Sequence, residues 1–208
     1  MWVQVPFSAP SGVGFLIRNP TLFITHGIMV KEIVMDIYEI NDSNVCDVAR
    51  LMSEIKPDWW DYEGARSQLR QSDLLAKLVG WYISDGEKVK GWILCAEFEG
   101  YSYLSIENLG YDEDGSFVME EQIEPLLSRA ERHARSKGFR NLKYIISSID
   151  MSCDGRVIDD YGDELKRLKS NGRKHFDYFV SYGFVATGFI PNCYGEGRHG
   201  IVMVKSLM

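Results

Sequence analysis

The first third of the chain shows a clear pattern of hydrophobic and polar positions. Apolar and polar residues alternate over residues 33–40, which predicts a first β-strand. Apolar side chains then recur at helical spacing over residues 45–55, and Pro57 follows the expected end of that helix. A second helix is expected over residues 63–75, after an aromatic-rich loop. The pattern therefore predicts one strand followed by two helices.

Three strands with turn signals between them follow the second helix. Asp85-Gly86 and Glu99-Gly100 are typical turn residues between apolar runs. We expect strands at residues 78–83, 89–98 and 101–111. Consecutive strands joined by tight turns predict an antiparallel meander.

The second half of the chain begins with a long amphipathic helix. This helix is expected over residues 117–137, with Gly138 placed to end it. Its inner side carries Ile123, Leu126, Leu127 and Ala130, and His133 falls on the opposite, polar side. The remaining expected elements are a strand at 142–147, helices at 163–169 and 176–182, and strands at 184–190 and 201–204.

A meander followed by a strand-helix-strand arrangement predicts an α/β fold, with a mixed, mostly antiparallel central sheet flanked by helices. We expect one domain over residues 35–208. Residues 1–34 differ in pattern and are expected to lie outside that domain. Residues 3–10 can be back-translated into a string that looks like the T-arm of a tRNA gene followed by CCA. Residues 1–34 are then a non-native extension before a start at Met29 or Met35, or else an ordinary flexible extension.

Composition narrows the functional classes. The 208 residues are 45% hydrophobic and 25% charged, with a formal net charge of -7, which argues against nucleic-acid binding because phosphate contacts need clustered Lys and Arg. No apolar run approaches the roughly 18 residues of a membrane span. The four cysteines form no C-x-x-C pair and the histidines no metal-ligand spacing, so we expect no metal site and a reducing, cytoplasmic compartment.

Three segments carry a resemblance to a known family. They are Ile106-Glu-Asn-Leu109, the run from Leu126-Leu127 to Gly138-Phe139, and the segment from Phe179 to Gly183-Phe184. In order and spacing the chain resembles the GNAT (GCN5-related N-acetyltransferase) family. The resemblance implies the GNAT acyl-CoA N-acyltransferase fold, with acetyl-CoA as co-substrate in a gap between the fourth and fifth strands. It also implies transfer of the acetyl group to a small-molecule or protein amine.

The resemblance also implies where the co-substrate would lie. Pantetheine would meet the backbone of the fourth strand at Leu109, Gly110 and Tyr111. The pyrophosphate would lie near the start of the long helix, at Ser116, Phe117, Val118 and Met119, because free backbone amides there bind anions.

The loop over residues 114–123 departs from the family pattern. It lacks the basic residue and the small residues near the helix start, and it carries Glu120 and Glu121, which would repel pyrophosphate. An alternative interpretation therefore stays open, a non-catalytic GNAT-like domain that binds a ligand or a partner. A third is a homodimeric interaction module that uses its exposed aromatic side chains. The closing strands could also offer an edge for pairing two chains.

Two residues are candidates for acid–base chemistry. Glu107 occupies the acidic position of the Ile-Glu-Asn-Leu match and is the candidate general base, with Glu97 and Glu99 as weaker candidates. Phe179 stands where the family has its acid tyrosine, so the adjacent Tyr178 is the candidate acid. The alternatives are a surface role for Glu107 and, for Tyr178, a ring that covers the core.

The loop between the first two helices carries the candidate substrate-binding residues Trp59, Trp60 and Tyr62. By resemblance this loop contacts the acceptor, and an aromatic side chain there could pack on the alkyl part of an amine or make a cation–π contact. Simple core packing is the competing interpretation of the same three residues.

Overall fold

The structure is a computed structural model, and it describes residues 35–70, 76–112 and 119–208, with the side chains from residue 122 onward in the last range. The described residues belong to one unit, Met35–Met208. The extension expected over residues 1–34, with the candidate start at Met29, lies outside the described residues.

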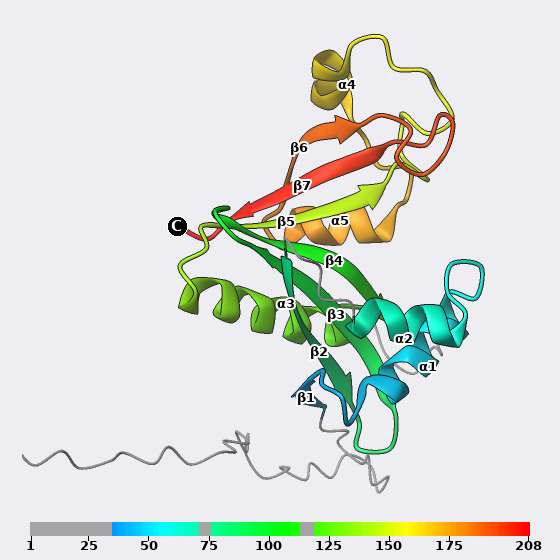
Figure 1. The fold of residues 1–208 in the computed structure, drawn as a ribbon. Helices are drawn as coiled ribbons and strands as arrows, with labels where there is room; N and C mark the ends of the chain where they lie inside the picture. Colours follow the sequence, from blue (N-terminus) through cyan, green and yellow to red (C-terminus); the bar gives the residue numbers. More distant parts are fainter. Residues whose placement is uncertain (1–34, 71–75, 113–118) are drawn as a thin grey trace, which may run out of the picture. The chain divides into compact units, whose positions relative to one another are not determined.

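One mixed sheet of seven strands organises the described residues, in the order β1-β2-β3-β4-β5-β7-β6. The strands are β1 (Asp36–Glu39), β2 (Ala76–Ser84), β3 (Val89–Phe98), β4 (Tyr103–Tyr111), β5 (Asn141–Ser147), β6 (Val185–Ile190) and β7 (Gly200–Ser206). Only β4 and β5 pair in parallel, and every other neighbouring pair is antiparallel (Figure 1). This confirms the mixed, mostly antiparallel sheet that the sequence predicts.

Five helices accompany the sheet in the described part of the chain. They are α1 (Val45–Ile55), α2 (Tyr62–Arg70), α3 (Met119–Ser136), α4 (Tyr161–Arg167) and α5 (Lys174–Ser181). Each corresponds to a helix expected from the sequence, with ends that differ by a few residues. The α4 helix begins where the Asp160 side chain accepts a hydrogen bond from the Asp163 N–H, so a local cap decides that boundary.

Strand β3 contributes to two hydrophobic clusters, one on each face of the sheet. Trp92 and Leu94 pack in the cluster that α1 and α2 cover. Ile93 and Cys95 belong to the larger cluster that α3 covers, and the four side chains are almost completely buried. Figure 1 shows α3 on one side of β2 and β3, with α1 and α2 on the other. Because the strand is buried on both faces, its sequence is a continuous apolar run over residues 92–96.

The inner side of α3 is the expected one, because Ile123, Leu126, Leu127 and Ala130 are all fully buried. The expectation for His133 is wrong. Its Nε2 lies 2.6 Å from Glu97 Oε1, and its ring lies 5.1 Å from the Trp81 ring. The last turns of α3 still lie over β2 and β3, so the helix face that meets the sheet is wider than the apolar stripe alone indicates.

Candidate functional site

The candidate site lies where β4 and β5 separate. The two strands pair over four residues each, from Tyr103↔Asn141 to Ile106↔Tyr144. Both strands continue beyond this point, β4 to Tyr111 and β5 to Ser147. Figure 1 shows their C-terminal ends diverging. The ladder between them therefore ends in the middle of the sheet, which leaves backbone groups of both strands facing a gap.

A bulge in β4 accompanies the separation. Cys95 of β3 pairs with Ile106 and Leu94 pairs with Asn108, so Glu107 is an extra residue on β4. Bulges bend the strand that carries them and increase its twist, so this one turns the rest of β4 away from β5. The Glu107 side chain is exposed at the bend. The candidate base therefore lies at the point where the gap opens.

The alternation of hydrogen bonds decides which groups of β4 face the gap. The Asp112 N–H donates to the Lys90 carbonyl at 2.7 Å. Because hydrogen-bonded residues alternate along an antiparallel pair, Gly110 also directs its N–H and C=O at β3. Leu109 and Tyr111 direct theirs at the gap. Of the three residues expected to meet pantetheine, Leu109 and Tyr111 thus have the required direction and Gly110 does not.

Lys56, the residue after α1, reaches the gap from the α1–α2 face. Its Nζ donates to the Leu109 carbonyl at 3.2 Å and lies 6.0 Å from the centroid of the Trp92 ring. The Lys56 carbonyl accepts hydrogen bonds from the N–H groups of Trp59 and Trp60, both at 3.0 Å. The turn that positions these tryptophans therefore also fixes the backbone of Lys56.

Tyr194 reaches the same gap from the loop between β6 and β7. The Ser148 N–H donates to the His199 carbonyl, so even-numbered residues at this end of β5 face β7 and Ile145 faces the gap. The Tyr194 hydroxyl donates to the Ile145 carbonyl at 3.2 Å. Burial raises the pKa of this phenol, and the charges of Cys193 and Glu107 add to the rise while Arg173 opposes it. Tyr194 therefore belongs to the residues beside the gap.

The three aromatic candidates between α1 and α2 separate in the structure. Trp59 is 65% exposed, and its ring lies 6.1 Å from that of Tyr194. Trp60 and Tyr62 instead pack against the hydrophobic cluster of α1 and α2. The structure therefore brings only Trp59 toward the gap, and the other two take the core-packing alternative.

Solved structures share the fold of this chain. The aminoglycoside 6'-N-acetyltransferase in complex with coenzyme A superposes with a TM-score of 0.71 at 13% identity, over 83% of this chain and 97% of that chain. The chain has the fold of the GNAT acetyltransferases. A GNAT-family acetyltransferase structure from Desulfovibrio desulfuricans gives a TM-score of 0.61 at 10% identity, over 84% of this chain and 100% of that one.

Another similar structure is the ribosomal-protein-S18-alanine N-acetyltransferase of Escherichia coli, with a TM-score of 0.58 and 11% identity. It covers 84% of this chain and 94% of its own. By sequence, neither a family model nor a curated protein matches the chain. The likeness to the GNAT fold therefore rests on the tertiary structure and not on sequence identity.

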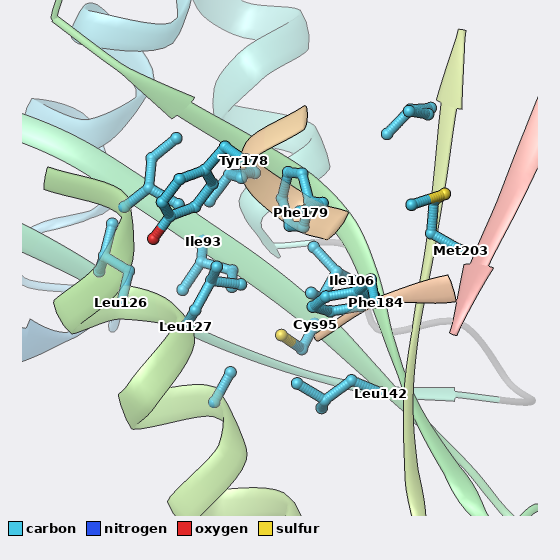
Figure 2. Packing of buried hydrophobic residues seen from close by; sticks show 14 of the residues in the cluster. Ile93, Cys95, Ile106, Leu126, Leu127, Leu142, Tyr178, Phe179, Phe184 and Met203 are labelled. Carbon is cyan, nitrogen blue, oxygen red and sulfur yellow. The ribbon is translucent and has the colours of Figure 1, made fainter. Parts of the chain in front are cut away.

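Helix α5 carries Phe179 and the candidate acid Tyr178. Phe179 is 1% exposed. Its ring centroid lies 4.9 Å from that of Tyr144 and 5.1 Å from that of Phe184. Tyr178 is 8% exposed, and its ring stacks on Tyr182 at 6.0 Å. Figure 2 shows the Tyr178 hydroxyl directed toward the side on which Leu126 and Leu127 of α3 lie. Tyr178 is therefore a core tyrosine between α3 and α5, and its role as acid stays a prediction.

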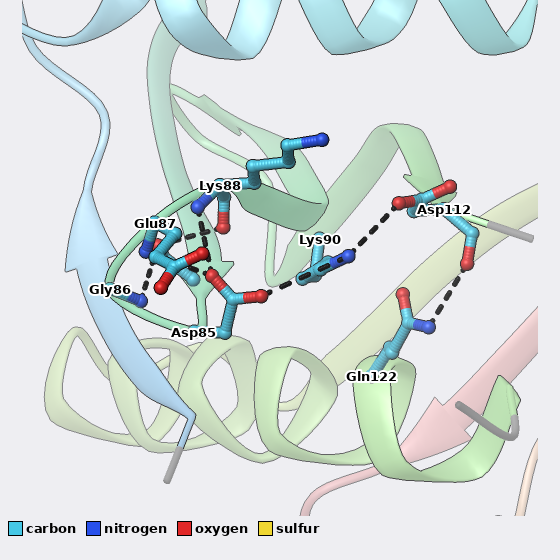
Figure 3. A network of polar contacts seen from close by, with 8 residues as sticks. Asp85, Gly86, Glu87, Lys88, Lys90, Asp112 and Gln122 are labelled. Atoms are coloured by element: carbon cyan, nitrogen blue, oxygen red, sulfur yellow. Dashed lines mark hydrogen bonds and ion pairs between the residues drawn. The ribbon is translucent and has the colours of Figure 1, made fainter. Parts of the chain in front are cut away.

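The end of β4 is held by a polar network, drawn in Figure 3. Lys90 is 5% exposed, and its Nζ lies 3.3 Å from Asp112 Oδ2 and 3.9 Å from Asp85 Oδ2. The Gln122 side chain of α3 donates to the Asp112 carbonyl at 3.0 Å. The network therefore joins the end of β4 to the first turn of α3. Of the residues expected to meet pyrophosphate, Met119 begins α3, and Ser116, Phe117 and Val118 lie outside the described residues.

Three broader features concern metal binding, membrane spans and thiols. Within residues 35–70, 76–112 and 119–208, no three His, Cys, Asp or Glu side chains are grouped so as to hold a metal ion. Over the same ranges, no helix combines the length and the apolar character needed to cross a bilayer. The four cysteines are all free thiols.

Sequence reasoning did not predict Lys56 or Tyr194 as site residues. Lys56 follows a helix whose end is marked by Pro57, and Tyr194 lies in a Gly-rich turn. The one available signal was the place of each residue in the chain. Lys56 directly follows an expected helix, and Tyr194 follows an expected strand. At the gap, Lys56 contacts a residue that is 53 positions away in the chain, and Tyr194 contacts one that is 49 positions away. A local sequence pattern does not encode such contacts.

Proposed function

We propose that the chain is an acetyl-CoA-dependent N-acetyltransferase that transfers an acetyl group to an amine of a small molecule or a protein. The observation that carries the proposal is the early end of the β4–β5 ladder, with the polar backbone groups of Leu109 and Tyr111 facing the gap. The coenzyme A complex of a protein with the same fold supports acetyl-CoA as the co-substrate. The named substrates of the similar enzymes, an aminoglycoside and a ribosomal protein, support both acceptor classes.

In this proposal the pantetheine arm lies along Leu109, Gly110 and Tyr111, with the hydrogen bonds made by Leu109 and Tyr111. The Leu109 N–H stabilises the oxyanion that forms when the amine attacks the thioester carbonyl. Glu107 accepts the proton of the amine, directly or through one water. Tyr178 protonates the departing thiolate. Residues Ser116 to Met119, up to the first residue of α3, hold the pyrophosphate with backbone N–H groups.

The acceptor amine would approach from the side on which Trp59 and Tyr194 lie. The exposed Trp59 ring offers an apolar and π surface to the carbon skeleton of the amine. Trp60 and Tyr62 belong to the same substrate-binding segment and pack against the α1–α2 cluster. The position of Glu107, exposed beside the gap, suits a base that meets an incoming acceptor.

Calorimetric titration with acetyl-CoA tests the proposal first. We expect saturable binding, and an absence of heat at millimolar ligand would contradict it. Release of coenzyme A is then followed by chromatography with a panel of amines and peptides, because the exposed Cys193 would consume a thiol reagent.

The variant Glu107→Gln tests the proposed base. It is expected to lower kcat by about 100-fold or more, with little change in acetyl-CoA affinity. Glu87→Gln, in the exposed turn after β2, is the matched control and should leave turnover unchanged. Equal turnover of both variants would remove Glu107 from the mechanism.

The burial of Phe179 at the position of the family's acid tyrosine favours a second candidate, a GNAT-like domain that binds a ligand or partner without catalysis. This candidate predicts that coenzyme A is not released with any amine, even where a ligand binds. Tyr178→Phe separates the two, because loss of turnover with unchanged acetyl-CoA binding supports the enzyme.

Two further expectations stay part of the proposal. The free thiols support a reducing, cytoplasmic location. Strand β6 forms one edge of the sheet, with Val185 63% exposed, which supports a homodimer through that edge. Sedimentation equilibrium of the wild type and of Val185→Lys tests the dimer, since the charge should shift the mass to that of a monomer.

A further inference from the structure

We propose that Lys56 is a self-acetylation site, at which the chain transfers an acetyl group from its own bound acetyl-CoA. This inference rests on the proposed function and extends it to regulation of the same site. The observation behind it is the placement of a lysine amine on the one stretch of β4 that would hold the thioester.

The position of Lys56 is determined by backbone and side-chain contacts together. Its N–H donates to the Met52 carbonyl at 3.0 Å, and its carbonyl accepts from two N–H groups of the following turn. From this anchored backbone, Nζ reaches the Leu109 carbonyl at 3.2 Å over a distance of 53 residues in the chain. The same Nζ lies 6.0 Å from the centroid of the Trp92 ring. The amine is thus held beside β4 and is not one of many exposed, mobile lysines.

The Leu109 carbonyl that Lys56 contacts faces the gap between β4 and β5. In the proposed function, Leu109 and Tyr111 supply the hydrogen bonds to the pantetheine next to the thioester. A pantetheine amide that bonds to this carbonyl would displace Nζ from it. The displaced amine would remain tethered within reach of the thioester carbon, because its backbone does not need to move. Tethering raises the effective concentration of a nucleophile far above that of an amine free in solution.

The chemical step is the ordinary aminolysis of a thioester. The Lys56 ammonium first loses a proton to solvent or to Glu107. The neutral Nζ attacks the acetyl carbonyl carbon, and the Leu109 N–H stabilises the oxyanion. Collapse of the intermediate breaks the C–S bond, the nitrogen loses its second proton, and coenzyme A leaves as the thiol. The products are acetyl-Lys56 and free coenzyme A, with no other reactant needed.

Acetylation would change the site in a predictable way. It removes a positive charge beside Leu109 and leaves a bulkier neutral amide at the entrance used by the acceptor. We therefore expect the modified chain to turn over an acceptor amine more slowly than the unmodified chain. Low acceptor supply would favour modification, because the external amine and Lys56 compete for the same acetyl group.

The test is peptide mapping by mass spectrometry of the full chain incubated with isotope-labelled acetyl-CoA. Lys137, exposed after the end of α3, is the internal reference for spontaneous acetylation. We expect Lys56 to be labelled faster than Lys137 by about tenfold or more, as a held amine should be. The rate should not depend on protein concentration, and added coenzyme A should suppress it. Lys56→Arg should lose this fast label while it retains acetyl-CoA binding.

The outcomes separate this inference from the proposed function. Calorimetric binding of acetyl-CoA with Lys56 labelled no faster than Lys137 would overturn self-acetylation and leave the acetyltransferase proposal intact. A labelling rate that rises with protein concentration would overturn the intramolecular reaction as well. Absence of acetyl-CoA binding would overturn both.

Discussion

The indole ring of Trp92 occupies the space above Gly110 on the neighbouring strand. A Cβ on Gly110 would overlap three carbons of that ring, the most distant of them at 2.8 Å. The same indole donates from Nε1 to the Asn108 side chain at 3.1 Å. Trp92 therefore packs flat across β4 between Asn108 and Gly110, and β4 needs a glycine there. The relationship joins the α1–α2 cluster to the strand that carries the candidate site.

Replacing Gly110 with alanine should destabilise the fold. The fully buried Trp92 has no room to retreat, so we expect the free energy of unfolding to fall by about 1–3 kcal/mol, as for overpacked cores. Chemical denaturation measures the change. Gly188→Ala in β6 is the matched control, since a Cβ there meets nothing within 4 Å. Equal stability of the two variants would contradict the close packing of Trp92.

Removing the charge of Lys90 should destabilise the fold at the end of β4. Lys90 lies between the carboxylates of Asp85 and Asp112, and its loss would leave two like charges without their common cation. We expect Lys90→Met to lower the free energy of unfolding by about 2–4 kcal/mol, because breaking a mostly buried pair leaves charges uncompensated. Lys88→Met changes an exposed lysine two residues away and serves as the control. An unchanged denaturation midpoint for Lys90→Met would rule out a stabilising network.

Tyr182 should ionise late and make stability fall at alkaline pH. Burial raises the pKa of its phenol to about 12, although the hydrogen bond with Ser128 opposes the shift. Because the folded pKa lies above the unfolded value near 10, the stabilisation is complete below pH 10 and is lost as pH rises toward about 12. Ultraviolet titration of the wild type and Tyr182→Phe measures the late phenol. A phenolate band of Tyr182 near pH 10 would contradict its burial.

The cysteines should differ sharply in reactivity. Burial raises the pKa of the Cys95 thiol, and the charges of Glu107 and Glu97 add to the rise, so this thiol stays protonated and inert. Cys193 is exposed and should react first with iodoacetamide. Mass spectrometry over a time course locates the label, with Cys193→Ser as the control. Early alkylation of Cys95 in the folded chain would show that β3 opens more readily than its burial indicates.

The sequence by itself determined the elements and much of their order. Apolar runs bounded by turn residues placed the three meander strands, and helical spacing placed α1 and α3, with Gly138 fitting the end of α3. These signals arise from contacts between near neighbours in the chain. The Ile-Glu-Asn-Leu match also placed β4, and the role of Glu107 stays a prediction. His133 was misplaced because a helical stripe shows which residues are apolar, and not how far a sheet extends beneath them.

Only the tertiary structure decided the candidate site. The early end of the β4–β5 ladder, the bulge at Glu107 and the direction of the Leu109 carbonyl follow from strand pairing, which sequence pattern leaves open. Lys56 lies at the gap through its contact with Leu109, 53 residues away in the chain, and Tyr194 through its contact with Ile145, 49 residues away. Such contacts depend on how loops from distant parts of the chain are positioned by the packed sheet, so no local pattern could have named them.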